Sequence, residues 1–188
     1  MKAVYRSIKP YWLYLILIGK KTIEVGKTFP KADDWNKEVF LNCSKDMKSF
    51  NRIPEKDREW MRKYLGKCAC RFVCNDYSPY ISNCTVFESV LFPSPDDLAE
   101  MGLTLEEFNA YGTRGKLLYG WHISDLVIYD EPRELSEFYT VVENEDCGKC
   151  RYYDTPCENE PCNQCQGGRK YLAKPPQSWC YVESEDIK

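Results

Sequence analysis

Residues 2–28, KAVYRSIKPYWLYLILIGKKTIEVGKT, decide the fold class, because they hold a strand, a helix and a second strand in direct succession. Residues 2–7 have the composition of a strand, and Pro10 then stands at the first position of a helix that ends at Gly19. From position 21 to 28 apolar and polar residues alternate, so Ile23 and Val25 share one face while Glu24 lies on the other. The segment therefore predicts a half-buried strand with one polar face, directly after a short helix.

The rest of the chain continues as short strands with few helices. We expect strands at Glu38–Cys43, 67–75, 117–129 and 178–182, a helix at 54–65, two helices within 94–112, and a turn or short helix at 133–138. Strands and helices do not alternate regularly, as they would in a doubly wound parallel sheet. The sequence therefore predicts an all-β or α+β barrel in a single domain, residues 1–188, with a frayed acidic tail at 184–188.

Composition limits how this chain contacts a partner. Its 188 residues are 43% apolar, which is enough for one real core. The net charge of -3 and the pI near 5.4 argue against a protein that coats nucleic acid through bulk positive charge, so any such contact must be local. The first nine residues lack the pattern of a signal peptide, and the apolar stretch at 11–18 is far below the roughly 20 residues that cross a bilayer. We therefore expect a cytoplasmic protein without a membrane contact.

Five of the eleven cysteines crowd into positions 147–165, in a stretch rich in Gly, Pro and Asn. Two CxxC pairs at this spacing place four thiolates around one tetrahedral ion, as in structural zinc sites. The predicted Zn²⁺ ligands are Cys147, Cys150, Cys162 and Cys165, with Cys157 as an alternate ligand or a free thiol. Four thiolates leave no open position for water, so the metal orders the insertion at 146–168 and does not catalyse a reaction. A redox CxxC pair is the alternative.

Three further cysteines, Cys68, Cys70 and Cys74, fall at every second position of one predicted strand, beside Phe72. The alternation predicts that these three cysteines share one face of that strand. We interpret them as small buried hydrophobic residues rather than as a second metal site. A nucleophilic role for Cys180 would need a base, and the chain has a single histidine.

Two short runs, SIKPYW at 7–12 and GKKTIEV at 19–25, resemble the signature of the ASCH family. The pattern of that family is a glycine, a lysine two residues on, a glutamate three further and an arginine two beyond that. Gly19, Lys21 and Glu24 match it, while Gly26 stands in the place of the arginine. Later runs, GWHISD at 120–125, YDEPRELSEF at 129–138 and PPQSWCYVE at 175–183, resemble the phage and prophage branch of the family.

Gly26 is the main departure from the pattern. An arginine binds phosphate or carboxylate at two points at once, and glycine supplies neither charge nor side-chain donors. Natural divergence, with Lys27 or Arg6 compensating, fits the sequence as well as an introduced substitution that disables a site.

The resemblance implies an α+β fold, a PUA-like (ASCH) small β-barrel with peripheral helices and a zinc-knuckle insertion. It also implies that RNA or a modified nucleotide binds in a cleft of the barrel. Because the family includes an amidohydrolase acting on acetylated cytidine and proposed ribonucleases, a hydrolase is the alternative. The amidohydrolase pattern, however, has threonine in the place of Glu24. A third possibility is a phage-encoded protein that binds a host protein through its knuckle.

Candidate site residues follow from this resemblance and from side-chain chemistry. In the binding interpretation Lys21 supplies a point charge, Glu24 accepts from a base amino group, and tryptophans offer stacking surfaces. In the hydrolase alternative Lys21, Glu24 and His122 are catalytic. Simpler roles are an ion pair between Lys21 and Glu24, core packing for the tryptophans and a hydrogen bond for His122. The candidate ligand-binding residues are Lys9, Trp12, Lys21, Glu24, Gln177, Ser178 and Trp179.

Overall fold

The computed structural model describes residues 2–30, 35–83, 91–112, 116–140 and 171–184. Its strands are β1 (Lys2–Ile8), β2 (Ile23–Gly26), β3 (Glu38–Cys43), β4 (Cys68–Val73), β5 (Tyr77–Ile81), β6 (Leu117–His122), β7 (Ser124–Arg133) and β8 (Trp179–Glu183). They form a five-stranded sheet of order β7-β4-β3-β1-β8 and a three-stranded sheet of order β2-β6-β5. Only β1 and β3 pair in parallel, and the other pairs are antiparallel.

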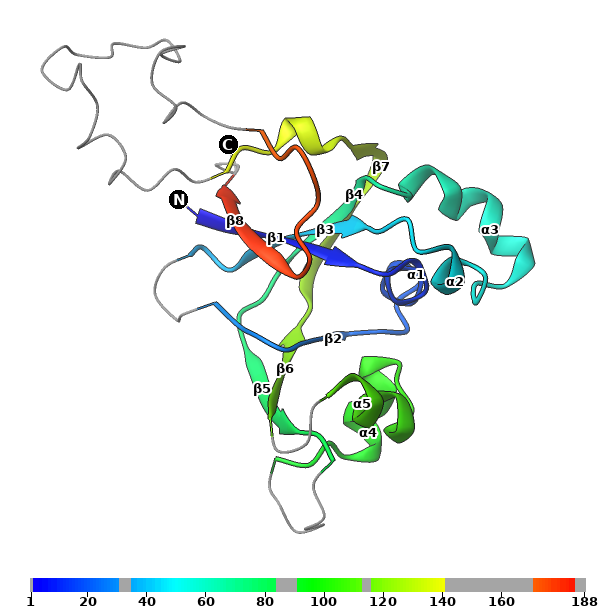
Figure 1. Cartoon of the computed structure of the whole chain (residues 1–188), viewed down its shortest axis with the longest axis vertical. Coiled ribbons are helices and arrows are strands. Elements are labelled where there is room, and N and C mark those ends of the chain that lie inside the picture. The colour runs from blue at the N-terminus through cyan, green and yellow to red at the C-terminus, as the bar shows by residue number, and fades with distance from the viewer. Residues whose placement is uncertain (1, 31–34, 84–90, 113–115, 141–170, 185–188) are drawn as a thin grey trace, which may run out of the picture.

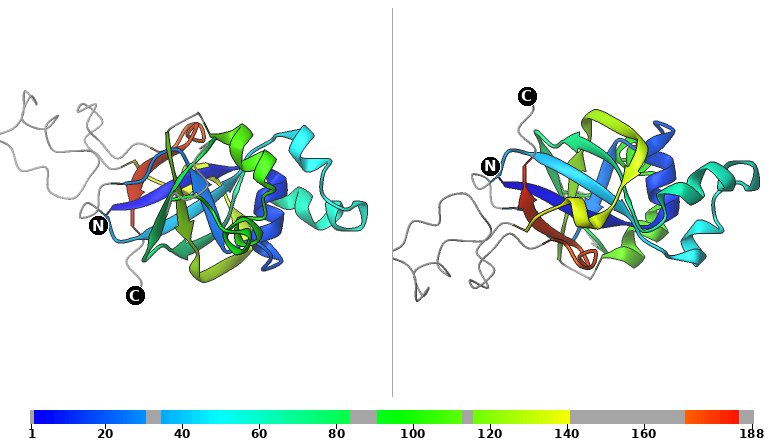
Figure 2. Two further views of the ribbon diagram at one scale, coloured as in Figure 1. Left: turned by 90° about the horizontal axis from the view of Figure 1, so that it is seen from below. Right: turned by 90° about the horizontal axis from the view of Figure 1, so that it is seen from above.

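The helices form two groups, and the group within residues 10–61 lies at one end of the strands in both views of Figure 2. They are α1 (Pro10–Leu17), α2 (Met47–Phe50), α3 (Glu55–Met61), α4 (Pro95–Met101) and α5 (Leu105–Tyr111), with 3-10 turns at Arg62–Tyr64 and Leu135–Glu137. In Figure 1, α1, α2 and α3 lie beyond the five-stranded sheet, whereas α4 and α5 lie beside β2. The predicted α+β class is confirmed. Within the described ranges no helix is long and apolar enough to span a membrane.

The expected barrel is not closed among the described strands. The single strand predicted at 117–129 divides at Ile123 into β6 and β7, which belong to different sheets. Asp125 has a positive φ of 47°, and the pairing of β7 with β4 shifts register twice. Such irregularities bend a strand, so this one segment leaves the three-stranded sheet and enters the five-stranded sheet.

Cys68, Cys70 and Cys74, in β4 and directly after it, are buried as predicted, but they do not all share a face. The pairing of β4 with β7 shifts register between Cys68 and Cys70, which breaks the alternation of side chains. Cys70 and Cys74 therefore pack with Phe72 in the core beneath α1, whereas Cys68 packs with Tyr5 in a separate core cluster. The interpretation of these cysteines as buried hydrophobic residues is confirmed, whereas the prediction that they share one face of the strand is wrong.

Two elements of the structure, β5 and α2, were not predicted from the sequence. Strand β5 contains Pro79, which argues against a strand, but β5 is an edge of the three-stranded sheet, where a missing N–H is tolerated. Helix α2 is a single turn, too short to produce a helical period. It begins where the Asp46 carboxylate accepts a hydrogen bond from the backbone N–H of Ser49 at 3.0 Å.

Candidate functional site

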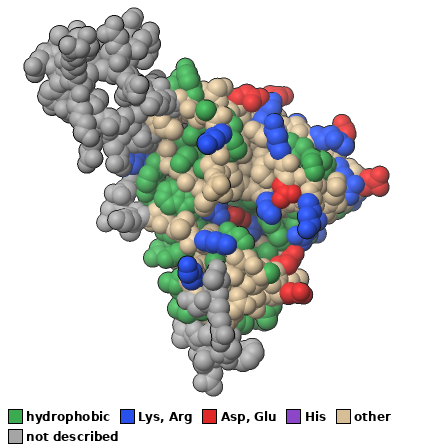
Figure 3. All heavy atoms as spheres, viewed as in Figure 1, with side chains coloured by type: hydrophobic (Ala, Val, Ile, Leu, Met, Phe, Trp, Pro, Cys, Tyr) green, Lys and Arg blue, Asp and Glu red, His purple; other side chains and the backbone are tan. Residues whose placement is uncertain are grey.

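A cleft of about 720 Å³ lies between the two groups of helices. One wall is the end of β1 and the start of α1 with the 44–52 segment, and the other is β2 with α5. Residues 175–177 form a third side. In the space-filling view, basic and acidic side chains gather around a hollow in the middle of this face (Figure 3).

Three charged side chains are buried at the bottom of the cleft, and Glu24 is at their centre. One Glu24 carboxylate oxygen lies 3.1 Å from Nη2 of Arg6, and the other lies 3.3 Å from Nζ of Lys21. Arg6 and Lys21 are 3% exposed and Glu24 is 7% exposed, so the three groups are nearly withdrawn from water. Two cations thus share one carboxylate, and the buried group carries one net positive charge.

Backbone carbonyls hold both cations in place. Lys21 Nζ donates to the carbonyl oxygens of Ile23 at 2.8 Å and Met101 at 2.6 Å, so with Glu24 its three ammonium hydrogens all have acceptors. Arg6 Nη2 also donates to the carbonyl of Val25 at 2.8 Å. Burial lowers the pKa of Lys21 from its ordinary value, and the Glu24 carboxylate opposes that shift.

Arg6 fills the space in front of Gly26, which explains the departure seen in the sequence. A Cβ at position 26 would lie 2.9 Å from Nε1 of Trp121 and 3.0 Å from Nη1 of Arg6. Of the two compensating residues suggested by the sequence, the structure therefore places Arg6 next to Gly26, with its guanidinium on Glu24. The small residue at 26 and the buried arginine on β1 fit together.

The rim of the cleft carries a second set of charges. Lys9 pairs with Asp46 at 3.2 Å, and Arg52 pairs with Glu107 of α5 at 2.7 Å, an exposed ion pair that joins the two walls. The Arg52 guanidinium also lies over the rings of Tyr11 at 4.1 Å and Trp12 at 4.7 Å.

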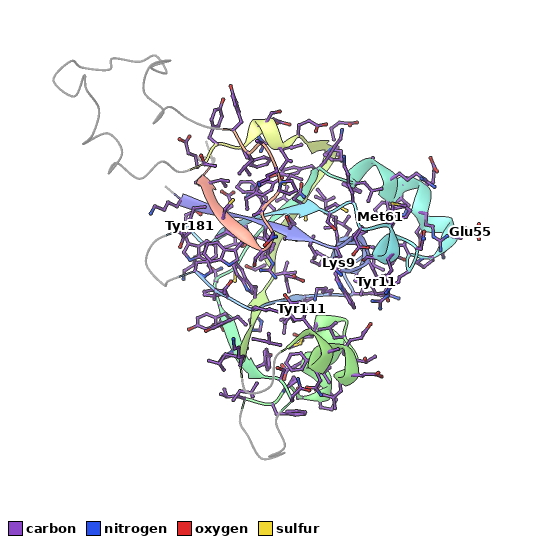
Figure 4. The ribbon with its side chains drawn as sticks, in the orientation of Figure 1. Lys9, Tyr11, Glu55, Met61, Tyr111 and Tyr181 are labelled. Atoms are coloured by element: carbon purple, nitrogen blue, oxygen red, sulfur yellow. The ribbon has the colours of Figure 1, made fainter. Side chains whose placement is uncertain are left out.

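The lining as a whole is positive. Five cationic and three anionic side chains line the cleft, an excess of two positive charges in a chain whose net charge is negative. Tyr111, at the end of α5, completes one wall, and Figure 4 shows it across the cleft from Lys9. Burial raises the pKa of the Tyr111 hydroxyl, and the positive charge of Arg6 opposes that shift. The cleft therefore combines a polar, positive interior with partly exposed aromatic side chains.

Five of the predicted ligand-binding residues line this cleft: Lys9, Trp12, Lys21, Glu24 and Gln177. Ser178 and Trp179 follow directly after the lining segment but are not part of the lining. The backbone carbonyl of Ser178 accepts from the N–H of Ser7 at 3.0 Å, and Trp179 Nε1 donates to Thr28 at 2.8 Å. Sequence reasoning did not include Arg6 in the site, although the missing arginine at position 26 had pointed to it.

His122 lies outside the cleft lining. In the antiparallel pairing of β2 with β6, His122 is opposite Ile23, whereas Glu24 is opposite Trp121. Paired residues point to the same face and successive residues to opposite faces, so His122 and Glu24 lie on different sides of the sheet. The ring Nε2 of His122 is 2.8 Å from the Ser78 hydroxyl. The structure thus brings Lys21 and Glu24 together but does not bring His122 to them.

The proposed zinc ligands, positions 147–165, lie outside the described residues. In the part of the chain that the structure covers, no group of three or more His, Cys, Asp or Glu side chains is placed to hold a metal. Burial raises the pKa of the thiols of Cys43, Cys70 and Cys74 to about 12. These thiols stay protonated at neutral pH, as expected for packing residues.

The sequence matches no family model and no curated protein. Among solved structures, the chain is similar to ASCH from Zymomonas mobilis, with 12% identity over 97% of this chain and 88% of that chain and a TM-score of 0.49. A tyrosine-to-phenylalanine mutant of the same Zymomonas mobilis protein is similar over 98% of this chain and 92% of that chain, with 12% identity and a TM-score of 0.47. A similarity at this level assigns neither a family nor an activity to the chain.

Proposed function

We propose that this chain binds RNA or a nucleotide in the cleft, with the base directed to Glu24 and the phosphate at the rim. The observation that carries the proposal is the buried Arg6–Glu24–Lys21 group at the bottom of a cleft of about 720 Å³. Pockets of roughly 300–1,000 Å³ hold small-molecule ligands and use a few polar groups to orient them, and the volume of this cleft falls in that range. Lys21 and Glu24, the two residues of this group that match the ASCH pattern, support the same proposal.

Glu24 favours a base rather than a phosphate at the bottom of the cleft. Each carboxylate oxygen engages one cation and keeps a lone pair for a donor, and a carboxylate accepts hydrogen bonds from base amino groups. A phosphate diester has no hydrogen to donate to these carboxylate oxygens, whereas a base amino group has. Trp12, half-buried beside Lys21, offers a ring on which a base stacks.

The rim suits the phosphate. Lys9, Lys48 and Arg52 line the cleft near the start of α1, and both lysines are exposed. Lys9 and Arg52 have acidic partners, Asp46 and Glu107, and a phosphate would exchange those contacts for its own. Exposed ion pairs are weak, so this exchange costs little.

Calorimetric titration tests the proposal with cytidine and cytidine monophosphate as the paired probes. We expect the nucleotide to bind more tightly than the nucleoside, and Lys48→Gln to weaken only the nucleotide. Lys56→Gln, an exposed lysine on α3, is the matched control and should leave both affinities unchanged. The proposal is wrong if the parent protein binds neither of these probes, and also binds neither the nucleotides of the other bases nor single-stranded RNA.

A hydrolase is the second candidate, because burial lowers the pKa of Lys21 and Lys21 contacts Glu24 inside the cleft. Its three engaged ammonium hydrogens favour a binding role over that of a base or nucleophile. Incubation with N4-acetylcytidine and with labelled RNA decides between the two. Turnover that disappears in Lys21→Met, a variant checked by its melting temperature, would establish the enzyme.

For the segment 146–168 we keep the proposal of one structural Zn²⁺, held by Cys147, Cys150, Cys162 and Cys165 with Cys157 as alternate. Its support is the spacing of the CxxC pairs alone. Elemental mass spectrometry should find one zinc per chain, and a variant with Ser at 162 and 165 should lose it. A host-protein contact through the same segment would show as a partner captured by the full chain and lost with residues 147–165 deleted.

A further inference from the structure

Beyond the residues that line the cleft, two aromatic side chains of β8 lie on the face of the five-stranded sheet that carries Arg6. In the antiparallel pairing of β1 with β8, Trp179 is opposite Arg6 and Tyr181 is opposite Val4. Paired residues share a face, so both aromatic side chains project to the side on which Arg6 meets Glu24. Residues 175–177, which line the cleft, lead directly into Trp179. In Figure 4 the labelled side chains run from Lys9 past Tyr111 to Tyr181 across this view.

Aromatic rings and lysines are combined in a strip around these two side chains, which we call the β8 strip and define as Lys2, Lys27, Thr28, Trp179 and Tyr181. The rings of Trp179 and Tyr181 meet edge to face at 5.3 Å, and both are half-buried. Trp179 Nε1 donates to the Thr28 hydroxyl at 2.8 Å, which fixes the indole beside the end of β2. Lys2 Nζ lies 5.3 Å from the centre of the Tyr181 ring.

Lys27 connects the strip to the cleft. Its Nζ lies 4.9 Å from the centre of the ring of Tyr111, which itself lines the cleft. The cations Lys9, Lys48 and Arg52 line the cleft near the start of α1, whereas Lys27 and the rings of the β8 strip lie outside the lining. Lys27 reaches the cleft through Tyr111, and Trp179 through the lining segment 175–177 that precedes it. An arrangement of stacking rings interleaved with cations is the one that binds single-stranded nucleic acid without reading a duplex groove.

We propose that the ligand is a single-stranded RNA segment of several nucleotides, whose central base enters the cleft and whose neighbouring bases stack on the β8 strip. This inference rests on the proposed function and extends it, because a mononucleotide would leave the strip unused. The lysines beside the rings, and the position of Trp179 just after the lining segment 175–177, favour a nucleic acid strand over an apolar peptide as the occupant.

Fluorescence anisotropy with labelled oligocytidylates of two, four and six nucleotides, and competition by cytidine monophosphate, tests the length of the ligand. Each stacked base strengthens binding severalfold, so we expect the tetranucleotide to bind at least about tenfold more tightly than the mononucleotide. Trp179→Ala should weaken the tetranucleotide by about tenfold and change the mononucleotide by less than about twofold.

Two further variants separate stacking from a structural effect. Trp179→Phe keeps a ring but loses the hydrogen bond to Thr28, and it should retain most of the tetranucleotide affinity. Trp60→Ala, at a partly exposed tryptophan of α3, is the matched control and should change neither affinity.

The outcomes keep the two proposals apart. If the mononucleotide binds and longer chains bind no more tightly, or if Trp179→Ala weakens both ligands equally, the β8 strip is not a binding surface and the cleft proposal stands. If no ligand of any length binds, the proposed function itself fails.

Discussion

Glu24 is the residue that joins the buried charges at the bottom of the cleft. Its two partners come from different elements, Arg6 from β1 and Lys21 from the segment before β2. The expected half-buried strand is wrong, because all four residues of β2 are buried and Glu24 is paired opposite the buried Trp121. The ion pair of Glu24 with Lys21, one of the two roles that the sequence left open, is present. The sequence offered Arg6 only as one of two compensations for Gly26, because which residue of another strand faces Glu24 depends on how the two sheets pack.

Glu24→Gln should lower the free energy of unfolding by roughly 3–5 kcal/mol, since removal of the shared carboxylate leaves two buried cations without a counter-charge. Urea unfolding followed by tryptophan fluorescence measures the change. Glu107→Gln is the control, because that side chain belongs to an exposed ion pair and should cost less than about 1 kcal/mol. If the two variants lower the free energy of unfolding equally, the Arg6–Glu24–Lys21 group is not buried as the structure has it.

Gly26→Ala should destabilise the fold by roughly 1–3 kcal/mol through overpacking. The added methyl group would lie 2.9 Å from Nε1 of Trp121, a fully buried ring that cannot withdraw. It would also lie 3.0 Å from Nη1 of Arg6, whose guanidinium is held by Glu24. Thermal unfolding measures the change, and a melting temperature at or above that of the parent protein would show that this space is open.

Among the elements, those governed by local chemistry were predicted well. The β3 strand was predicted with the bounds that the structure has, and α4 and α5 are the two helices expected within 94–112. In the structure Ser94 and Thr104 form the capping boxes at their starts. The predictions were wrong for strands whose ends and side-chain alternation depend on the strands that pair with them. The β6 and β7 strands looked like one strand until the two sheets divided them, and β4 lost its alternation where its pairing shifts register.

Because of the buried thiols of β3 and β4, we expect the free energy of unfolding to decrease at alkaline pH. Burial raises the pKa of Cys43 and Cys70 from 9.0 to about 12, so the folded state keeps protons that the unfolded state releases above pH 9. This contribution is complete below pH 9 and is lost as the pH rises from 9 towards 12. The loss is at most about 1.4 kcal/mol per pH unit for each thiol.

Urea unfolding between pH 8 and 10.5 under reducing conditions measures this dependence. We expect the free energy of unfolding to fall as the pH rises above 9. In the Cys70→Ala variant this free energy should fall less steeply, because one of the buried thiols is missing. Parallel curves for parent and variant would mean that Cys70 titrates as a solvated thiol.

At the scale of the whole molecule, the negative net charge and the positive cleft lead us to expect only a few phosphate contacts in the proposed complex. Three cations at the rim contact phosphate in the proposed complex, and each phosphate contact with a single strand contributes about −0.7 to the slope of log affinity against log salt concentration. The expected slope is therefore about −2 for a short RNA. Anisotropy titrations at salt concentrations from about 50 to about 300 mM measure this slope.

Lys48→Gln should reduce the magnitude of the slope by about 0.7, whereas Lys56→Gln should leave it unchanged. A slope steeper than about −4 would indicate a broad basic surface and would contradict binding confined to the cleft.

The sequence by itself determined the α+β class, most strands and helices, the buried thiols, and Lys21 and Glu24 as the polar pair of the first helix–strand segment. These follow from local periodicity, capping and composition, which act over a few neighbouring residues. Only the tertiary structure decided that Arg6 joins that pair beside Gly26, that His122 lies on the opposite side of the sheet, and that Trp179 lies on the face of Arg6. Those outcomes depend on strand register and on the packing of two sheets, which bring together residues that are far apart along the chain.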